Sequence, residues 1–283
     1  MIPDVLKTYI QDYLDSGTPV YTALSAGDIN EVYKISINTN NYVVKINSAE
    51  KFPEMFEKEA AGLNALRATN SIRIPKVMDC ANVGDFSFIM MEYIETGRKK
   101  DVFWVDFGHK LAHLHKNPAP YFGFVSDNYI GSLHQQNNKQ INAVDFYIEE
   151  RIEPQIKLAA EKGFSFKNID SFYTNLKSLL PNEAPSLIHG DLWNGNYLVD
   201  KHGNPCLIDP AVCYAPREMD ISMMHLFGGF DQMLFNAYHE IFPLQPNWED
   251  RLELWQLYYL LVHLNIFGAG YYQGTKRIVN TYS

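Results

Sequence analysis

The residue types best suited to chemistry lie in His189-Gly190-Asp191-Leu192-Trp193-Asn194-Gly195-Asn196, a segment followed by two short apolar runs and Asp209. Transfer of a phosphoryl group to an alcohol needs a carboxylate that accepts the hydroxyl proton and oxygen ligands that hold magnesium on the phosphates. We predict that Asp191 is the base and that Asn196 and Asp209 bind Mg²⁺, which prefers hard oxygen donors. The alternative is that these residues only make turns, but a base, an amide and a carboxylate in this order favour a phosphotransfer site.

Histidines near this segment and upstream of it are further candidates for proton transfer or metal binding. His189 stands just before a turn, so we predict that it packs and hydrogen-bonds to brace the loop rather than acting as the base. His113 and His115 are two residues apart and do not share one face of a helix, so we expect them to be structural.

A lysine and a glutamate upstream complete the charged set. Lys45 lies in the apolar run Val43-Val44-Lys45-Ile46, and Glu59 lies on the apolar stripe of the next expected helix. Either charge would be costly to bury alone. We therefore predict a Lys45–Glu59 ion pair, with the lysine also reaching the phosphates of ATP. The alternative is that both side chains point to solvent at the edges of their elements.

Two further segments are suited to binding a nucleotide. The loop at residues 25–30, with Gly27 and Asp28, is predicted to lay backbone N–H groups over the phosphates. Met91, Glu92, Tyr93 and Ile94 lead out of an expected strand, where backbone groups are predicted to bind the adenine. The alternative for the side chains of 91–94 is ordinary packing at a strand end.

These residues are carried by two expected lobes. A helix at 5–14, a β-hairpin of 32–37 and 42–46, a helix at 56–66 and a strand at 86–91 predict a small α+β lobe. After residue 97 the pattern is mostly helical, at 102–115, 141–162, 169–180, 219–227, 232–241 and 248–267. We predict an α+β fold with an N-terminal lobe at 1–91, a hinge at 92–97 and a helical catalytic lobe at 98–283, with the chemistry on a strand-and-loop island at 186–209.

Composition narrows the possible partners. The 283 residues carry a formal charge of −9, which disfavours binding to nucleic acid. Three cysteines without a CxxC spacing predict ordinary thiols rather than a zinc cage or a disulfide framework. The longest apolar run, 255–264, is too short to span a membrane, and the first residues do not resemble a signal peptide. We expect a soluble cytoplasmic protein that binds no membrane.

Over nearly its whole length the sequence resembles the fructosamine and ketosamine 3-kinases, a branch of the aminoglycoside-phosphotransferase-like kinases. The shared segments are 26–30, 122–124, 127–132, 189–196, 208–211, 217–220, 226–230 and 265–268. The resemblance implies a two-lobed protein-kinase-like fold and ATP- and Mg²⁺-dependent phosphorylation of the 3-hydroxyl of a ketosamine, leading to protein deglycation.

The resemblance also assigns roles to individual residues. By this resemblance, Asp191 is the proton acceptor, and Lys45 and Glu59 are the pair that positions the phosphates. Asn196 and Asp209 are the magnesium ligands, and residues 91–94 are the hinge that binds the adenine. Trp193, next to the base, looks specific to this branch, so Trp193 and Asn194 are expected to contact the acceptor.

Two other functions remain open from the sequence. The same fold would serve a kinase of another amino-alcohol, such as choline or an aminoglycoside. A catalytically dead nucleotide-binding protein is a third possibility, although the complete charged and amide set argues against it. The expected partner is a free or protein-bound ketosamine, and the expected assembly is a monomer or a weak dimer.

Overall fold

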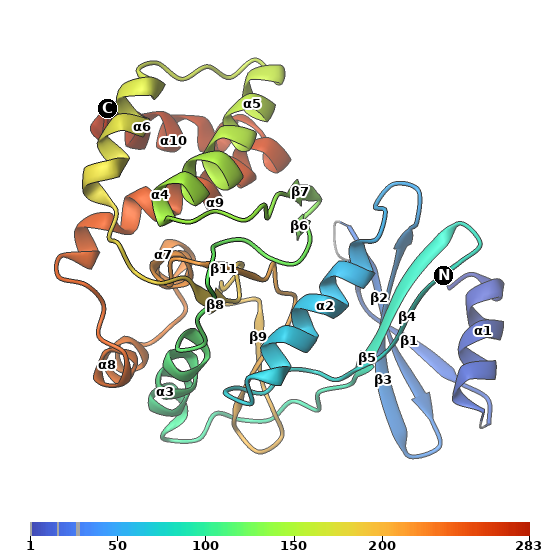
Figure 1. Cartoon of the computed structure of the whole chain (residues 1–283). Helices are drawn as coiled ribbons and strands as arrows, with labels where there is room; N and C mark the ends of the chain where they lie inside the picture. The colour runs from blue at the N-terminus through green and yellow to red at the C-terminus, as the bar shows by residue number, and fades with distance from the viewer. Residues whose placement is uncertain (1, 16, 27–28) are drawn as a thin grey trace.

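A five-stranded antiparallel sheet forms the N-terminal lobe, in the strand order β1-β2-β3-β5-β4. The computed structural model describes residues 2–15, 17–26 and 29–283. Helix α1 lies on one side of the sheet, and helix α2 lies on the side that faces the second lobe (Figure 1). The elements of this lobe are α1 Asp4–Leu14, β1 Val20–Ala26, β2 Glu31–Ile37, β3 Asn40–Ser48, α2 Met55–Ala68, β4 Val77–Val83 and β5 Phe86–Glu92.

Alternation along the central strands assigns side chains to the two covered faces of this sheet. In β5, Phe88 and Met90 pack in the core shared with α1, whereas Ile89 and Met91 belong to the core shared with α2. β5 is apolar on both faces because helices cover both faces. In β3, Val44 and Ile46 pack on the α1 side. Since successive side chains of a strand point to opposite faces, Lys45 between them is directed towards α2 and the other lobe.

Two strands of this sheet were missing from the sequence prediction. β1 and β4 are the edge strands, and β1 leaves Val20 and Leu24 exposed. Edge strands with little burial lack the alternation of apolar and polar residues on which the prediction relied. The loop predicted to precede the first strand therefore follows β1, and Lys45 lies on the third strand of the chain rather than the second.

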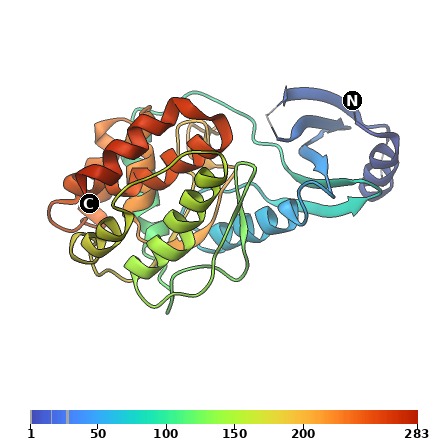
Figure 2. The ribbon, with the colours of Figure 1, turned by 90° about the horizontal axis from the view of Figure 1, so that it is seen from above.

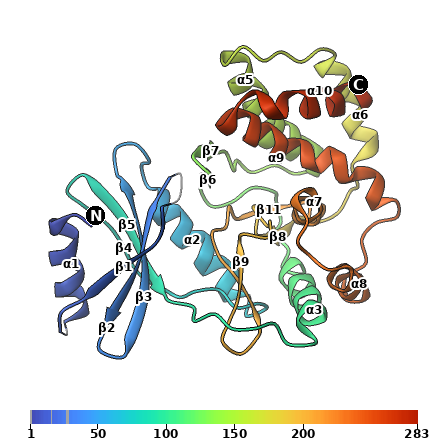
Figure 3. The same cartoon turned by 180° about the vertical axis from the view of Figure 1, so that it is seen from behind.

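Helices dominate the C-terminal lobe, as predicted (Figure 3). The helix predicted at 141–162 is a succession of a short α-helical turn, a π-helix and an α-helix, and a last helix, α10, had not been predicted. The helical elements are α3 Phe103–His115, α4 Ala143–Asp145, η1 Phe146–Ile152, α5 Glu153–Glu161, α6 Ile169–Leu179, α7 Glu218–Phe227, α8 Gln232–Ile241, η2 Trp248–Arg251, α9 Leu252–Phe267, η3 Ala269–Tyr271 and α10 Tyr272–Thr281.

The catalytic lobe also contains short strand pairs, and three of their strands lie within the strand-and-loop island predicted at 186–209. Their bounds are β6 Asn128–Ile130, β7 Leu133–Gln135, β8 Ser186–Ile188, β9 Tyr197–Val199, β10 Pro205–Leu207 and β11 Cys213–Ala215, paired β6 with β7, β8 with β11 and β9 with β10. Viewed from above, the sheet and the helical lobe form two bodies side by side with α2 between them (Figure 2). The hinge at 92–97 stays a prediction. In the described part of the chain, no helix combines the length and apolar character needed to cross a membrane.

Candidate active site

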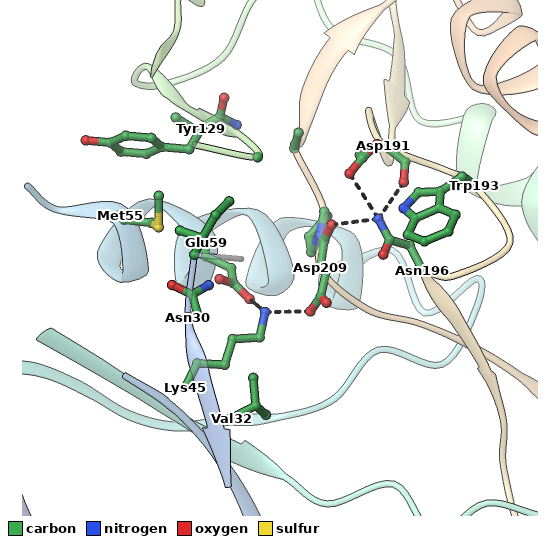
Figure 4. A pocket seen from close by; sticks show the side chains of 15 residues that line it. Asn30, Val32, Lys45, Met55, Glu59, Tyr129, Asp191, Trp193, Asn196 and Asp209 are labelled. Atoms are coloured by element: carbon green, nitrogen blue, oxygen red, sulfur yellow. Dashed lines mark hydrogen bonds and ion pairs between the residues drawn. The ribbon is translucent and has the colours of Figure 1, made fainter. Parts of the chain in front are cut away.

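The segment 189–196 forms a tight loop against the residues that follow Asp209. Gly190 has a φ of +83°, and a Cβ atom there would lie 2.0 Å from the carbonyl oxygen of Ala211, so only glycine fits. The N–H of Ala211 donates to the carbonyl of His189 over 2.9 Å. This close approach places Asp191 and Asp209 on the same side of the cleft between the lobes (Figure 4).

The buried Asp220 is hydrogen-bonded to the backbone of the 189–196 loop. Asp220 accepts the backbone N–H groups of His189 at 2.8 Å and Gly190 at 2.9 Å, and it contacts Nε2 of His115 at 3.2 Å. Burial alone would raise the pKa of Asp220, but the hydrogen bond and charge of His115 and the loop N–H group lower it below its ordinary value. Asp220 therefore acts as a charged anchor for the loop.

The predicted bracing role of His189 is confirmed. Its ring is fully buried, and its Nε2 donates to the carbonyl oxygen of Ile208 over 2.9 Å. Burial lowers the pKa of His189, so the ring stays neutral at neutral pH. The imidazole thus ties the loop to the residue directly before Asp209.

Asp191 lies half-buried at the base of the cleft and is bonded to Asn196. The Nδ2 of Asn196 donates to the backbone carbonyl of Asp191 over 2.8 Å and to its Oδ2 over 3.0 Å. Burial raises the pKa of Asp191 to about 7, against the lowering effect of the Asn196 hydrogen bond. A carboxyl group with such a pKa is suited to accept a proton near neutral pH.

The predicted ion pair between Lys45 and Glu59 is present and includes a third partner. Lys45 Nζ lies 2.6 Å from Glu59 Oε1 and 2.5 Å from Asp209 Oδ1. Burial alone would lower the pKa of Lys45, but the two carboxylates raise it above its ordinary value, so the ammonium stays charged. Lys45 therefore links a helix of the N-terminal lobe to the catalytic lobe.

The donor set around Asp209 suits magnesium. The Asp209 side chain remains 44% exposed although it pairs with Lys45, and the amide of Asn196 donates to the Asp209 backbone carbonyl over 3.4 Å. Among the described residues, no three His, Cys, Asp or Glu side chains form a metal cluster. One or two protein oxygen ligands completed by phosphate and water are typical of Mg²⁺ rather than of zinc or calcium.

Three adjoining cavities surround these residues. The first, of about 370 Å³, has the most polar lining of the three, contains the charged set and is called the polar cavity below. The second, of about 340 Å³, lies towards the predicted hinge. The third, of about 330 Å³, is walled mainly by apolar and aromatic side chains and is called the apolar cavity. Lys45 and Asp209 line both the first and the second cavity. Asp191 and Trp193 line both the first and the third. Asp191 thus stands where a phosphate site and an apolar site meet.

Other predicted site residues are placed as follows. The second cavity is lined by all four residues of the predicted adenine segment, Met91, Glu92, Tyr93 and Ile94. The backbone N–H of Glu92 donates to the backbone carbonyl of Lys76, so this N–H is not available to an adenine. Gly27 and Asp28 lie outside the described residues.

The two residues expected to contact the acceptor differ in position. The ring of Trp193 lies on Gly195, where a Cβ atom would come within 2.3 Å of it, so the glycine makes room for the indole. Asn194 packs against Gly229 and is absent from the residues that line the three cavities. The substrate roles of Trp193 and Asn194 stay predictions.

Three residues of the 127–132 segment also line the first cavity and had been given no role from the sequence. They are Asn128, Tyr129 and Gly131. The available signal was the segment itself, whose Asp-Asn-Tyr-Ile-Gly-Ser pattern is part of the family resemblance.

Fold and site together define a phosphotransferase of the protein-kinase-like fold. The crystal structure of a protein from Haemophilus somnus 129PT that is assigned as a fructosamine-3-kinase matches with a TM-score of 0.88 at 28% identity, covering 99% of this chain and 97% of the other. An aminoglycoside phosphotransferase, APH(4)-Ia, matches with a TM-score of 0.64 at 14% identity, covering 99% of each chain, which shows a shared fold.

Sequence comparison defines the family more narrowly. The sequence model for fructosamine kinase matches residues 6–282. A probable ketoamine kinase of Enterococcus faecium is 39% identical over 94% of this chain and 95% of its own length. The protein-ribulosamine 3-kinase of Arabidopsis thaliana, named as chloroplastic, is 36% identical over 92% of this chain and 81% of its own length. This chain belongs to the fructosamine kinase family and is an ATP-dependent phosphotransferase with an alcohol group as acceptor.

Proposed function

We propose that this protein is a ketosamine 3-kinase, which transfers the γ-phosphate of ATP to the 3-hydroxyl of a sugar-amine adduct and so serves protein deglycation. The observation that carries the proposal is the position of Asp191, which lines both the polar cavity with Lys45 and Asp209 and the apolar cavity beyond Trp193. A hydroxyl held in the apolar cavity would meet the phosphate at this carboxylate.

The second and first cavities together suit a nucleotide. Val32, Val43 and Leu198 give the second cavity apolar walls for an adenine, next to the 91–94 segment. From there the shared lining residues Lys45 and Asp209 lead into the polar cavity, where the phosphates would lie. Lys45 is positioned by Glu59, which directs the ammonium towards the α- and β-phosphates.

The catalytic roles follow from the bonding of each side chain. Bound Mg²⁺, held by Asp209 and the side-chain oxygen of Asn196, would neutralise charge on the phosphates. Asp191 orients the acceptor hydroxyl and takes its proton, while the amide of Asn196 keeps the carboxylate in place. Most of the rate enhancement would come from holding the reacting oxygen in line with the phosphorus.

The third cavity supports an acceptor with one positive charge. It is lined by aromatic and aliphatic side chains, and Asp191 is the one carboxylate among its described lining residues. Burial lowers the pKa of His263, so this lining histidine is neutral. A sugar joined to one amine suits such a pocket, because an aromatic wall attracts a single ammonium, whereas a polycationic aminoglycoside would need several carboxylates.

The relatives support the same acceptor class. Bacterial proteins similar to this chain are named ketoamine kinases, and two plant proteins are named protein-ribulosamine 3-kinases. The monomer or weak dimer and the cytoplasmic location stay predictions. The plant relatives are named as chloroplastic.

The test is phosphorylation of a panel of acceptors with Mg²⁺ and ATP. Fructosyl-, ribulosyl- and erythrulosyl-lysine are compared with choline and kanamycin, and Asp191→Ala serves as the blank. We expect ketosamines alone to be phosphorylated, with the phosphate located on the 3-hydroxyl by NMR, and no product from the variant. Turnover of choline or kanamycin alone, or full activity of Asp191→Ala, would refute the assignment.

A further inference from the structure

The hairpin formed by β6 and β7 crosses from the catalytic lobe to the N-terminal lobe beside the polar cavity. Its Tyr129 hydroxyl donates to the carbonyl of Pro53 over 3.0 Å, just before α2. The Tyr129 ring meets the ring of Phe52 edge-on, with 6.4 Å between the centroids. Figure 4 shows Tyr129 beyond the start of α2, on the same side as Met55. The outward side chain of β6 thus docks on the lobe that carries Lys45 and Glu59.

The inner side of the same hairpin holds the backbone that follows Asp209. Asn128 Nδ2 donates to the carbonyl of Val212 over 2.8 Å. Gln135 Nε2 donates to Asn128 Oδ1 over 2.7 Å and to the carbonyl of Ala211 over 3.3 Å. Both side chains are buried, so the two carbonyls depend on them for hydrogen bonds that water would otherwise supply.

The side-chain amides of Asn128 and Gln135 are themselves held by further buried hydrogen bonds. Arg151, fully buried on the π-helix η1, donates to Asn137 Oδ1 over 2.7 Å, and Asn137 donates to Asn128 Oδ1 over 3.0 Å. The hydroxyl of Tyr258 donates to Gln135 Oε1 over 2.6 Å. A buried network whose members hold one another in this way has a defined geometry, and π-helical turns occur frequently at functional sites.

Alternation along β6 explains how one short strand serves both lobes. Asn128 and Ile130 are buried in the catalytic lobe, whereas Tyr129 between them reaches the N-terminal lobe. Lys45 makes a second connection between the same regions, because it bonds to Glu59 of α2 and to Asp209. The hairpin and the ion-pair cluster are therefore two links between α2 and the 209–212 segment.

We propose that the β6–β7 hairpin is a positioning element of the phosphotransfer site: Asn128 and Gln135 fix the segment that carries Asp209, and Tyr129 fixes that segment relative to the nucleotide-binding lobe. This inference deepens the proposed function and uses its assignment of Asp209 to Mg²⁺. Asn128, Gln135 and Tyr129 are positioning residues, since they act on the reaction through Asp209.

The first test is the uncharged change Gln135→Met, which removes the donors to Ala211 and Asn128 at a residue that does not line the polar cavity. The measurement is the affinity for a non-hydrolysable ATP analogue with and without Mg²⁺. We expect the gain in affinity from Mg²⁺ to fall about tenfold while affinity without Mg²⁺ changes less than about twofold, because the carbonyl of Ala211 loses its buried donor. An unchanged Mg²⁺ effect, or an equal loss in both conditions, overturns the proposal.

The second test is Tyr129→Phe, with Tyr272→Phe as a matched control. Each change removes an exposed hydroxyl that donates to a distant backbone carbonyl, Pro53 in one case and Ser165 in the other. We expect the KM for ATP to rise about threefold in Tyr129→Phe and to stay unchanged in Tyr272→Phe. Equal effects of the two changes on KM contradict a positioning role.

Hydrogen exchange gives a readout that needs no acceptor. In Tyr129→Phe, whose altered hydroxyl is solvent-facing, we expect faster exchange in a peptide covering 209–214 in the presence of Mg²⁺ and the ATP analogue, and unchanged exchange there in Tyr272→Phe. Unaltered exchange in both overturns the proposal even if Gln135→Met does not fold. Because the analogue-binding and hydrogen-exchange measurements use nucleotide alone, their failure is separate from failure of the ketosamine panel.

Discussion

The cleft and the buried interior of the protein use aspartate in different ways. Asp191 and Asp209 lie in the cleft, where Asp209 stays 44% exposed and Asp191 lines two cavities. Asp200 and Asp220 are almost completely buried. The difference shows that the role of an aspartate in this segment depends on which groups bind its oxygens.

The buried pair is bonded mainly to backbone N–H groups and to cations. Asp200 accepts the N–H groups of His202 and Asn204, each at 2.9 Å, and the guanidinium of Arg73 at 2.8 Å. Asp220 similarly accepts two loop N–H groups and contacts His115. Aspartates bonded in this way stabilise loops, whereas those of the cleft remain able to bind a substrate or a metal.

The largest expected effect is the loss of activity when the cleft residue Asp191 is changed. Asp191→Asn should reduce kcat about 10³-fold, since general-base catalysis contributes roughly 10²- to 10⁴-fold, while the melting temperature changes little. Removing a buried charge that burial already disfavours costs the fold little. Turnover with a ketosamine and thermal unfolding of the same sample measure both effects. A large fall in melting temperature with retained turnover would break the comparison.

For the buried Asp220 we predict the opposite pattern, in which the main effect is on stability. Asp220→Asn should lower the free energy of unfolding by about 3 kcal/mol, because the amide leaves a loop N–H group without its charged acceptor. Urea unfolding at neutral pH measures the loss. Activity should fall as well, as the loop loses its anchor, but nucleotide binding by the folded fraction should persist. Stability equal to that of the unaltered protein would contradict the anchoring role.

The smallest expected effect is a loss of the stability that the Asp200 carboxylate contributes, as the pH is lowered. Burial alone would raise the pKa of Asp200, but the N–H groups of Asn204 and His202 and the side chain of Arg73 lower it to about 2. A carboxylate with a lowered pKa stabilises the fold fully above its unfolded value near 3.8, and that contribution is lost as the pH falls towards 2. The contribution is on the order of 1 kcal/mol.

The control for this prediction is Asp200→Asn. We expect the difference in unfolding free energy between the unaltered protein and this variant to shrink between pH 4 and pH 2, as measured by urea unfolding at each pH. A difference that stays constant over this range would mean that the Asp200 charge does not contribute.

The sequence alone predicted which charged and amide residues would lie together, because several of them are close along the chain. The order of Asp191, Asn196 and Asp209 fits on one loop and one pair of short strands, β9 and β10. The Lys45–Glu59 ion pair was predicted because each of two apolar elements contains one charged residue. This ion pair is confirmed. Local spacing and alternation were sufficient in both cases, since neighbouring elements usually pack together.

Tertiary structure alone decided which aspartates face the cleft and how the lobes are joined. Asp220 is an anchor because His115, 105 residues away, lies against it, and Tyr129 reaches Pro53 across 76 residues. The edge strands β1 and β4 likewise give weak patterns, because their burial depends on what packs beside them. A sequence pattern reports which side chains are available, whereas the groups that bind them come from distant segments that only the folded chain brings together.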